Sequence, residues 1–119
     1  MAAAKESLKR ARISPEQIQE SIWGSARQAG GGPNVARQIT YRAGAPETVP
    51  ADTVNQACGS GLKAIILAAQ EIMLGCAQAV LAGGTERPGS ASDGSAADLA
   101  ALADVLKLLN GDDPLGRCE

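Results

Sequence analysis

The most constraining feature of the sequence is a strand, a glycine-rich corner, a helix and a second strand in direct succession, from Pro50 to Gly84. The run VPADTVNQ predicts a strand that begins after Pro50, and AQAVLAGG predicts a short, mostly apolar strand of a parallel or mixed sheet. Between them, five apolar residues recur at helical spacing: Leu62, Ile65, Ile66, Ala69 and Ile72. Gly75 ends this helix, just after Leu74. A strand, a helix and a second strand in succession form a βαβ unit, whose crossover should be right-handed. The sequence therefore predicts an α/β fold.

Further elements are expected before this unit. AAAKESLKRARI is rich in helix-forming residues, and SPEQ follows it as a turn or a helix start. QESIWGS predicts a short strand that ends at Gly24, and NVARQITYRAG predicts a helix with Asn34 as its N-cap and Gly44 as its stop. The glycines at 30–32 could cradle a phosphate or form a flexible turn. They lack the Gly-Lys-Ser/Thr ending of a P-loop and the GxGxxG spacing, which favours the turn.

After Glu86 the composition shifts towards Ala, Ser, Gly, Asp and Leu, so we divide the chain into a region of residues 1–86 and a divergent tail, residues 87–119. The tail contains one expected amphipathic helix, with Ser95 as its cap and Gly111 at its end. Its apolar stripe consists of Leu99, Leu102, Leu106 and Leu109. A stripe of this kind is usually a core or partner-facing surface. A homo-oligomer could therefore form through the Leu99–Leu109 stripe or through exposed strands.

Composition excludes several functional classes. Of the 119 residues 45% are hydrophobic, but the only aromatic residues are Trp23 and Tyr41, so a core must be built from Ala, Leu, Ile and Val. The net charge of −2 lacks the basic excess of a nucleic-acid-binding protein. Because no apolar run is long enough to span a membrane and no secretory signal is visible, we expect a cytoplasmic protein. The cysteines lack metal-ligand spacing and histidine is absent, which argues against structural zinc and favours free thiols.

Cys58 stands at the corner between the expected strand and helix, and two interpretations of it are open. As a nucleophile, it would gain from the helix N-terminus, whose free N–H groups favour a thiolate. Gly59 and Gly61 would then permit a sharp turn and the close approach of a bulky thioester, as in a nucleophile elbow with Cys in place of Ser. As a structural residue, Cys58 would be a small buried side chain in a tight turn. We expect Cys76 in the core and Cys118 as a free thiol.

The sequence from about Ala3 to Glu86 resembles the N-terminal part of the thiolases, a family of acetyl-CoA acyltransferases. The similarity runs in order through ISPEQIQESIWGSARQAGGGPNVARQ, YRAGAPETVPADTVNQACGSGLKAI and AVLAGGTE. VNQACGSGLKAI is the most specific piece; ketoacyl synthases share the fold and a cysteine at this corner, but the Gly-Ser-Gly-Leu-Lys-Ala continuation is similar to thiolases. The resemblance implies a partial thiolase-like N-terminal domain, a mixed sheet with packed helices, incomplete at both ends. Complete thiolases have two similar α/β halves in five αβαβα layers, usually as dimers or tetramers.

The resemblance also implies a chemistry. Cys58 would attack an acyl-CoA and carry the acyl group as a thioester, and its backbone N–H would be one oxyanion donor. A second acyl-CoA would then attack to give acetoacetyl-CoA; the reverse reaction, thiolysis of a 3-ketoacyl-CoA, belongs to fatty acid metabolism. The CoA thioester is implied as a substrate, with no permanently bound cofactor and no metal. Arg27, Asn34 and Arg37 match family positions, and we expect surface or packing roles for them.

The sequence departs from the thiolase pattern in residues that turnover requires. Thiolases use a histidine to activate the nucleophile and a second cysteine to move the α-proton, whereas this chain has no histidine, and neither Cys76 nor Cys118 stands in a matching context. The family's first strand, its CoA-covering loop and the Ser-Met-Ser that follows GGTE are also missing. We therefore expect that this chain alone does not complete a turnover. The alternative to an acyltransferase is a non-catalytic thiolase-derived fragment or interaction module.

Overall fold

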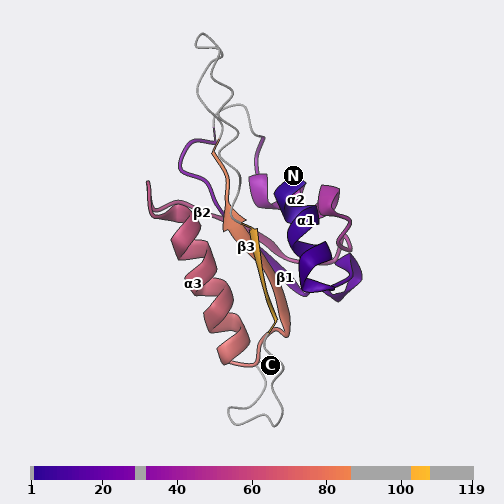
Figure 1. Ribbon diagram of the computed structural model, residues 1–119. Helices are drawn as coiled ribbons and strands as arrows, with labels where there is room; N and C mark the ends of the chain where they lie inside the picture. Colours follow the sequence, from indigo (N-terminus) through magenta and orange to yellow (C-terminus); the bar gives the residue numbers. More distant parts are fainter. Residues whose placement is uncertain (1, 29–31, 87–102, 108–119) are drawn as a thin grey trace.

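The protein is a layered α/β structure. The computed structural model describes residues 2–28 and 32–86 together with the backbone of residues 103–107. These residues form α1 (Ala2–Ala11), a 3-10 turn (Pro15–Gln17), β1 (Glu20–Gly24), α2 (Val35–Ala43), β2 (Ala51–Val54), α3 (Ser60–Met73), β3 (Ala79–Gly84) and β4 (Ala103–Lys107). α3 covers one face of the sheet, and α1 and α2 cover the other (Figure 1). The mixed sheet with packed helices that the sequence predicted is confirmed.

The strand order is β2-β1-β3-β4, with β1, β2 and β3 parallel and β4 antiparallel to β3. The strand that comes first in the chain is therefore flanked by strands that come later. Ser21 of β1, for example, is opposite Ala51 of β2 on one side and Leu81 of β3 on the other. Since β1, β2 and β3 run in the same direction, their carboxyl ends lie at one edge of the sheet, where α3 also begins.

The helix ends follow local signals in the sequence. The side chain of Asn34 accepts a hydrogen bond from the backbone N–H of Arg37, as the predicted N-cap of α2. Gly44, at φ 99°, ends that helix in the left-handed region that glycine adopts without a steric penalty. Ser14 and Gln17 form a capping box around the 3-10 turn. These local predictions are confirmed.

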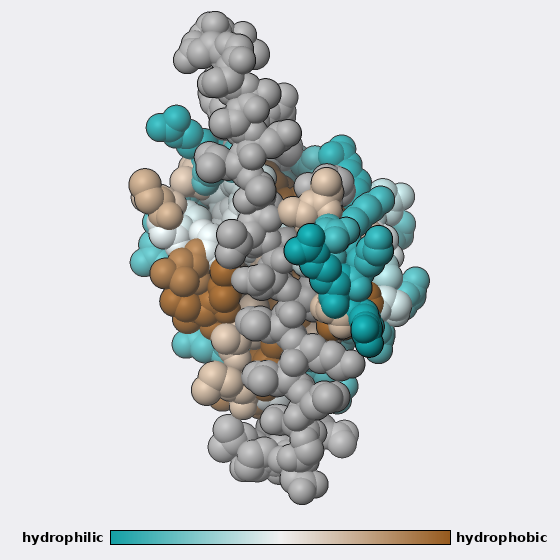
Figure 2. All heavy atoms as spheres, in the orientation of Figure 1, coloured by the Kyte–Doolittle hydropathy of each residue, from teal (hydrophilic) through white to brown (hydrophobic). Residues whose placement is uncertain are grey.

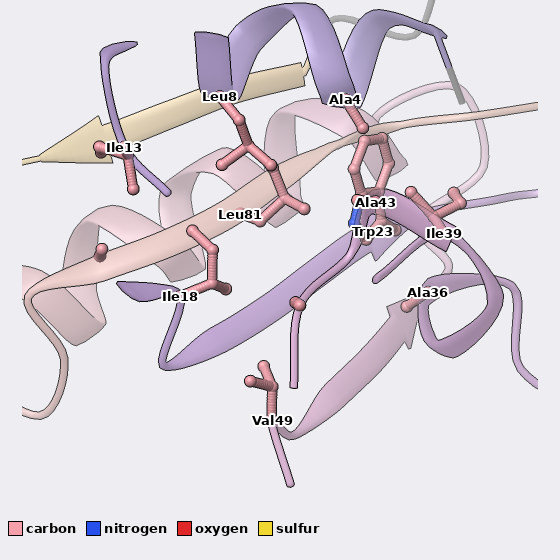
Figure 3. Close-up of a cluster of buried hydrophobic side chains, with 12 residues drawn as sticks. Ala4, Leu8, Ile13, Ile18, Trp23, Ala36, Ile39, Ala43, Val49 and Leu81 are labelled. Carbon is pink, nitrogen blue, oxygen red and sulfur yellow. The ribbon is translucent and has the colours of Figure 1, made fainter. Parts of the chain in front are cut away.

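Two apolar clusters stabilise the layers, and alternate residues of the strands belong to each. On the α1 and α2 side, Trp23 and Leu81 are fully buried, and Figure 3 shows Ala4 of α1 close to the Trp23 ring. On the α3 side, Ile22 and Val80 pack with three small or medium residues of the helix: Ala64, Ala68 and Ile72. The small alanine side chains let α3 approach the sheet closely.

The prediction of a helix across residues 95–111 is wrong at its centre. Residues 103–107 form strand β4, which pairs antiparallel with β3; the remainder of the predicted helix lies outside the described residues. Without this strand, one edge of β3 would present unpaired backbone N–H and C=O groups, and pairing satisfies them. Backbone pairing with β3 therefore determines the conformation of residues 103–107, in spite of the helical spacing of the leucines around them. The strand at residues 103–107 interrupts the predicted helix stripe, and a homo-oligomer stays a prediction.

None of the helices within the described ranges has both the length and the apolar character needed to cross a membrane.

Candidate active site

Cys58 lies at the carboxyl edge of the sheet, in the corner between β2 and α3, and its thiol is free and exposed. Gly59 is the residue that precedes the first turn of α3, so the thiol stands at the positive end of the helix dipole. The alternative interpretation, a small buried residue in a tight turn, is therefore wrong. The nucleophile interpretation of Cys58 stays a prediction.

The backbone of the corner is unusual at Ala57, which has φ 48°. In this left-handed region the Cβ of a non-glycine residue is crowded, which costs roughly 1–2 kcal/mol. Side chains on both sides hold the residue there. Asn55 Oδ1 accepts from the Ala57 N–H (3.1 Å), and Ser60 Oγ donates to the Ala57 carbonyl (2.6 Å) while accepting from the Gln56 N–H (2.8 Å).

The start of α3 packs against the ends of β1 and β3 through glycine backbone. A Cβ on Gly24 would overlap the backbone carbonyl of Ser60 and the nitrogen of Gly61, and a Cβ on Gly84 would lie 3.0 Å from the Cα of Gly61. Gly61 therefore faces the sheet, and the sequence interpretation that it makes room for a bulky thioester is not supported by its surroundings. A Cβ on Gly59 would meet only the carbonyl oxygen of Gln56, at 3.4 Å.

Glu86 ties the end of β3 to the segment that follows β1. Its carboxylate accepts from the backbone N–H of Ala26 (2.6 Å) and of Arg27 (2.9 Å). The carbonyl of the same Ala26 accepts from Asn55 Nδ2 (3.3 Å), which joins this segment to the corner of Cys58. Hydrogen bonds to an ionised carboxylate are stronger than neutral ones. The carboxyl ends of all three parallel strands are thus linked around the cysteine.

The other residues that the sequence analysis singled out have structural roles or lie elsewhere. The Arg37 guanidinium donates to the carbonyls of Val49 and Glu47, and Asn34 also donates to the Ala51 carbonyl, so both are packing residues, as expected. Arg27 is on the surface. Cys76 is half-buried and disulfide-bonded, so the expectation of free thiols is wrong for it. Cys118, the tail helix cap and the glycines at 30 and 31 lie outside the described residues.

Sequence reasoning missed Gly24, Asn55, Ser60 and Glu86 as parts of the site. Asn55 and Ser60 flank Cys58 closely in the sequence, and an Asn two residues before a left-handed position is a known turn signal that could have identified the first. Gly24 and Glu86 act through residues far away in the chain, and no local pattern marks them.

A separate group of carboxylates lies towards the opposite end of the central strand. Burial raises the pKa of Glu20 above its ordinary value, and the nearby negative charges of Glu71 and Asp52 raise it further. Among the described residues no group of histidine, cysteine and acidic side chains has the arrangement of a metal site. The candidate chemistry is centred on Cys58.

The fold is a layered α/β domain with an exposed cysteine at a strand–helix corner, and comparisons with known proteins identify its family. Residues 1–107 match the sequence profile of the thiolase N-terminal domain. The acetyl-CoA acetyltransferase of Cupriavidus necator is 52% identical over 87 residues, which are 73% of this chain and 22% of that protein. The cytosolic acetyl-CoA acetyltransferase of Rattus norvegicus is 49% identical over 82 residues, 69% of this chain and 21% of that protein.

Solved structures agree with the sequence match. A thiolase from Ascaris suum in complex with coenzyme A superposes with a TM-score of 0.68 at 40% identity, covering 70% of this chain and 22% of that one. Human mitochondrial 3-ketoacyl-CoA thiolase in complex with CoA gives 0.66 at 39% identity, with 70% and 21% covered. The chain belongs to the thiolase family. It spans about a fifth of the length of these relatives.

Proposed function

We propose that this chain is the acyl-accepting module of a thiolase-type acyltransferase, with Cys58 as the nucleophile. The observation that carries the proposal is the free, exposed thiol of Cys58 before the first turn of α3, in a chain of the thiolase family. The substrate class is an acyl-CoA, because relatives of this chain are acetyl-CoA acetyltransferases and two related thiolases were solved with CoA bound. No permanently bound cofactor takes part in the proposed reaction.

In the proposed half-reaction, Sγ of Cys58 attacks the carbonyl carbon of the acyl-CoA. A bond from this carbon to Sγ forms, the bond from carbon to the CoA sulfur breaks, and the proton of the Cys58 thiol ends on the departing CoA thiol. One thioester replaces another, so the step is close to energetically balanced. Covalent catalysis of this kind divides a difficult transfer into two easier steps.

The backbone N–H of Cys58 is the proposed oxyanion donor. In the hydrogen-bonding of the described residues, no bond uses this amide. The adjacent helix N-terminus adds partial positive charge where negative charge would develop on the acyl oxygen. A preorganised donor of this type contributes several kcal/mol to the stability of the transition state.

The proposal for the 119-residue chain is limited to acylation. By the family resemblance, a histidine activates the nucleophile and a second cysteine removes the α-proton of the second acyl-CoA. The chain contains no histidine, and neither Cys76 nor Cys118 stands in a context that matches the second cysteine. We therefore expect the acyl-enzyme to form slowly and not to turn over without residues supplied from elsewhere. A cytoplasmic location stays a prediction, since the Rattus norvegicus relative is cytosolic by name and the human relative is mitochondrial.

The proposal is tested by incubating the purified chain with acetyl-CoA and measuring its intact mass. We expect one acetyl adduct, located on Cys58 by peptide mapping and absent from Cys58→Ala. An adduct on another cysteine, or no adduct on folded protein whose Cys58 is alkylated by iodoacetamide, would contradict the proposal.

A second candidate function, a non-catalytic interaction module, is favoured by one observation. Along α3, on the side away from the sheet, Leu62, Ile66 and Met73 are 64%, 43% and 64% exposed. Figure 2 shows brown side chains gathered on the part of the surface where α3 lies. Exposed apolar surface of this kind marks contact sites. β2, one of the two outer strands of the sheet, is a further route to a homo-oligomer. Self-association without any acetyl adduct would favour this second function.

A further inference from the structure

The corner before α3 combines a strained residue with two side chains that hold it. Ala57, directly before Cys58, has φ 48°, and both of its peptide groups are occupied by side-chain hydrogen bonds. Asn55 Oδ1 accepts from its N–H, and Ser60 Oγ donates to its carbonyl. Such a conformation persists only where the surrounding structure fixes it, because ordinary residues avoid the left-handed region.

Both side chains are themselves anchored. Ser60 is only 2% exposed, and its hydroxyl also accepts from the Gln56 N–H. Both hydrogen bonds of this hydroxyl are therefore made to the two residues before Cys58. Asn55 is exposed, but its Nδ2 donates to the carbonyl of Ala26, whose N–H is in turn bound by Glu86. The corner is therefore tied to the ends of the neighbouring strands.

We propose that Asn55 and Ser60 are positioning residues for Cys58. By holding Ala57 in the left-handed conformation, they fix the direction in which the next amide and thiol project from the corner. The inference rests on the proposed function, since positioning matters only if Cys58 accepts an acyl group. A change of φ at residue 57 would reorient the backbone of Cys58 and Gly59, because the start of α3 at Ser60 is fixed. The Cys58 N–H and Sγ lie within this short span.

The experiment compares two reactions of the same thiol in the wild type, Ser60→Ala and Asn55→Ala. Acetylation by acetyl-CoA needs the thiol and the oxyanion donor in one geometry, so we expect it to slow by at least about tenfold in both variants. Alkylation by iodoacetamide depends on the exposure and ionisation of the thiol, and we expect it to change by no more than about twofold. Because an unfolded chain would also lose acetylation and keep the alkylation of its exposed thiol, the two rates are compared only in variants whose circular dichroism and urea unfolding show that they are folded.

A rescue and a matched control sharpen the test. Glycine adopts the left-handed region without a penalty, so Ala57→Gly in the Ser60→Ala background should recover part of the lost acetylation rate. Ser21→Ala removes another buried serine hydroxyl, on the opposite side of the sheet, where it accepts from Trp23 Nε1 and Thr40 Oγ1. This control should lose stability and keep the acetylation rate of Cys58 relative to its alkylation rate.

The outcomes are distinct. Selective loss of acetylation with rescue by Ala57→Gly supports the positioning role. Equal acetylation in the wild type, Ser60→Ala and Asn55→Ala, with the variants folded, overturns it and leaves the proposed function intact. If wild-type protein forms no adduct, the proposed function fails and the positioning role falls with it. NMR couplings of residue 57 would then show whether the two side chains still hold its backbone as a purely structural device.

Discussion

The close contact between β1 and the start of α3 depends on the absence of a side chain at Gly24. Its position against the backbone of Ser60 and Gly61 leaves no room for a Cβ. We expect Gly24→Ala to push the start of α3 away from the sheet and to lower the free energy of unfolding by about 1–3 kcal/mol. Urea titration followed by the fluorescence of Trp23, the single tryptophan, measures this change.

Gly59→Ala is the matched control for Gly24→Ala. Its added Cβ would lie 3.4 Å from the Gln56 carbonyl, an ordinary contact. We expect its stability to stay within about 0.5 kcal/mol of the wild type. Equal losses from the two substitutions would show that the close approach of α3 to β1 is not the limiting contact.

A pH-dependent prediction concerns Glu20. Burial, followed by Glu71 and Asp52, raises its pKa, so folding favours the protonated form. The unfavourable contribution of Glu20 to stability therefore appears as the pH rises from the ordinary glutamate range through the raised pKa. We expect Glu20→Gln to stabilise the protein at neutral pH and to have little effect in strong acid, as measured by urea unfolding across that range.

The pKa of Glu16 is shifted in the opposite direction to that of Glu20. Hydrogen bonding to its own backbone and to Ser14 lowers the pKa of this fully exposed carboxyl, so its contribution to stability is present at neutral pH and is lost as the pH falls through the lowered pKa. Glu16→Gln should therefore slightly destabilise the protein at neutral pH. A loss of stability in Glu20→Gln at neutral pH would contradict the electrostatic assignment.

Single residues also show what a sequence can predict about the site. Cys58 was identified because the strand, the glycines and the helix that position it are neighbours in the chain. Gly24 and Glu86 were not, because each acts on a residue that is close only after the strands have paired. The sequence also does not determine whether the Cys58 thiol is buried or exposed, and the structure shows that it is exposed.

At the scale of elements, α2 depends on Asn34. Its Oδ1 accepts from the Arg37 N–H and from Thr53 Oγ1, and its Nδ2 donates to the Ala51 carbonyl, so the cap also fastens α2 to β2. We expect Asn34→Ala to cost about 1–2 kcal/mol of stability. Circular dichroism during urea unfolding would measure it.

Asn34→Asp separates the two functions of this side chain. Aspartate retains the oxygen that caps the helix and loses the amide donor to Ala51, so it should fall between the wild type and Asn34→Ala. If Asn34→Asp is as unstable as Asn34→Ala, the link to β2 outweighs the cap.

Elements fixed by local signals were predicted well, and the one fixed by its partner was not. The 3-10 turn, α2 and α3 follow from capping residues, glycine stops and apolar periodicity, and they formed as expected. β4 lies within a run whose leucines recur at helical spacing, but its residues pair with β3. The unpaired N–H and C=O groups along the edge of β3 exist only once the sheet has formed. A short stretch of sequence around residues 103–107 therefore gives no sign of them.

At the scale of the whole molecule, the outer side of α3 should govern association. Contact with a partner would remove the apolar side chains of Leu62 and Met73 from water, at roughly 1.5–3 kcal/mol each. If the chain self-associates through this face, Leu62→Lys with Met73→Lys should weaken the association by at least about tenfold. Sedimentation velocity over a range of protein concentrations would measure this.

Tyr41→Lys is the control for that pair. Tyr41 is 59% exposed and lies on α2, which covers the opposite face of the sheet. The substitution should leave the association constant unchanged. Equal weakening by Tyr41→Lys would indicate that general charge repulsion, and not the apolar side of α3, controls association.

The order of the strands has a consequence for the synthesis of the protein. β1 is made before either of its neighbours, because its partners are residues 51–54 and 80–84. A ribosome adds about 5–20 residues per second, so Ile22 and Trp23 leave the exit tunnel on the order of seconds before the chain that will cover them. During that interval the nascent chain presents an apolar, unpaired strand, which is a binding site for chaperones and a starting point for aggregation. Production at lower temperature or with added chaperones should therefore raise the soluble yield of this protein.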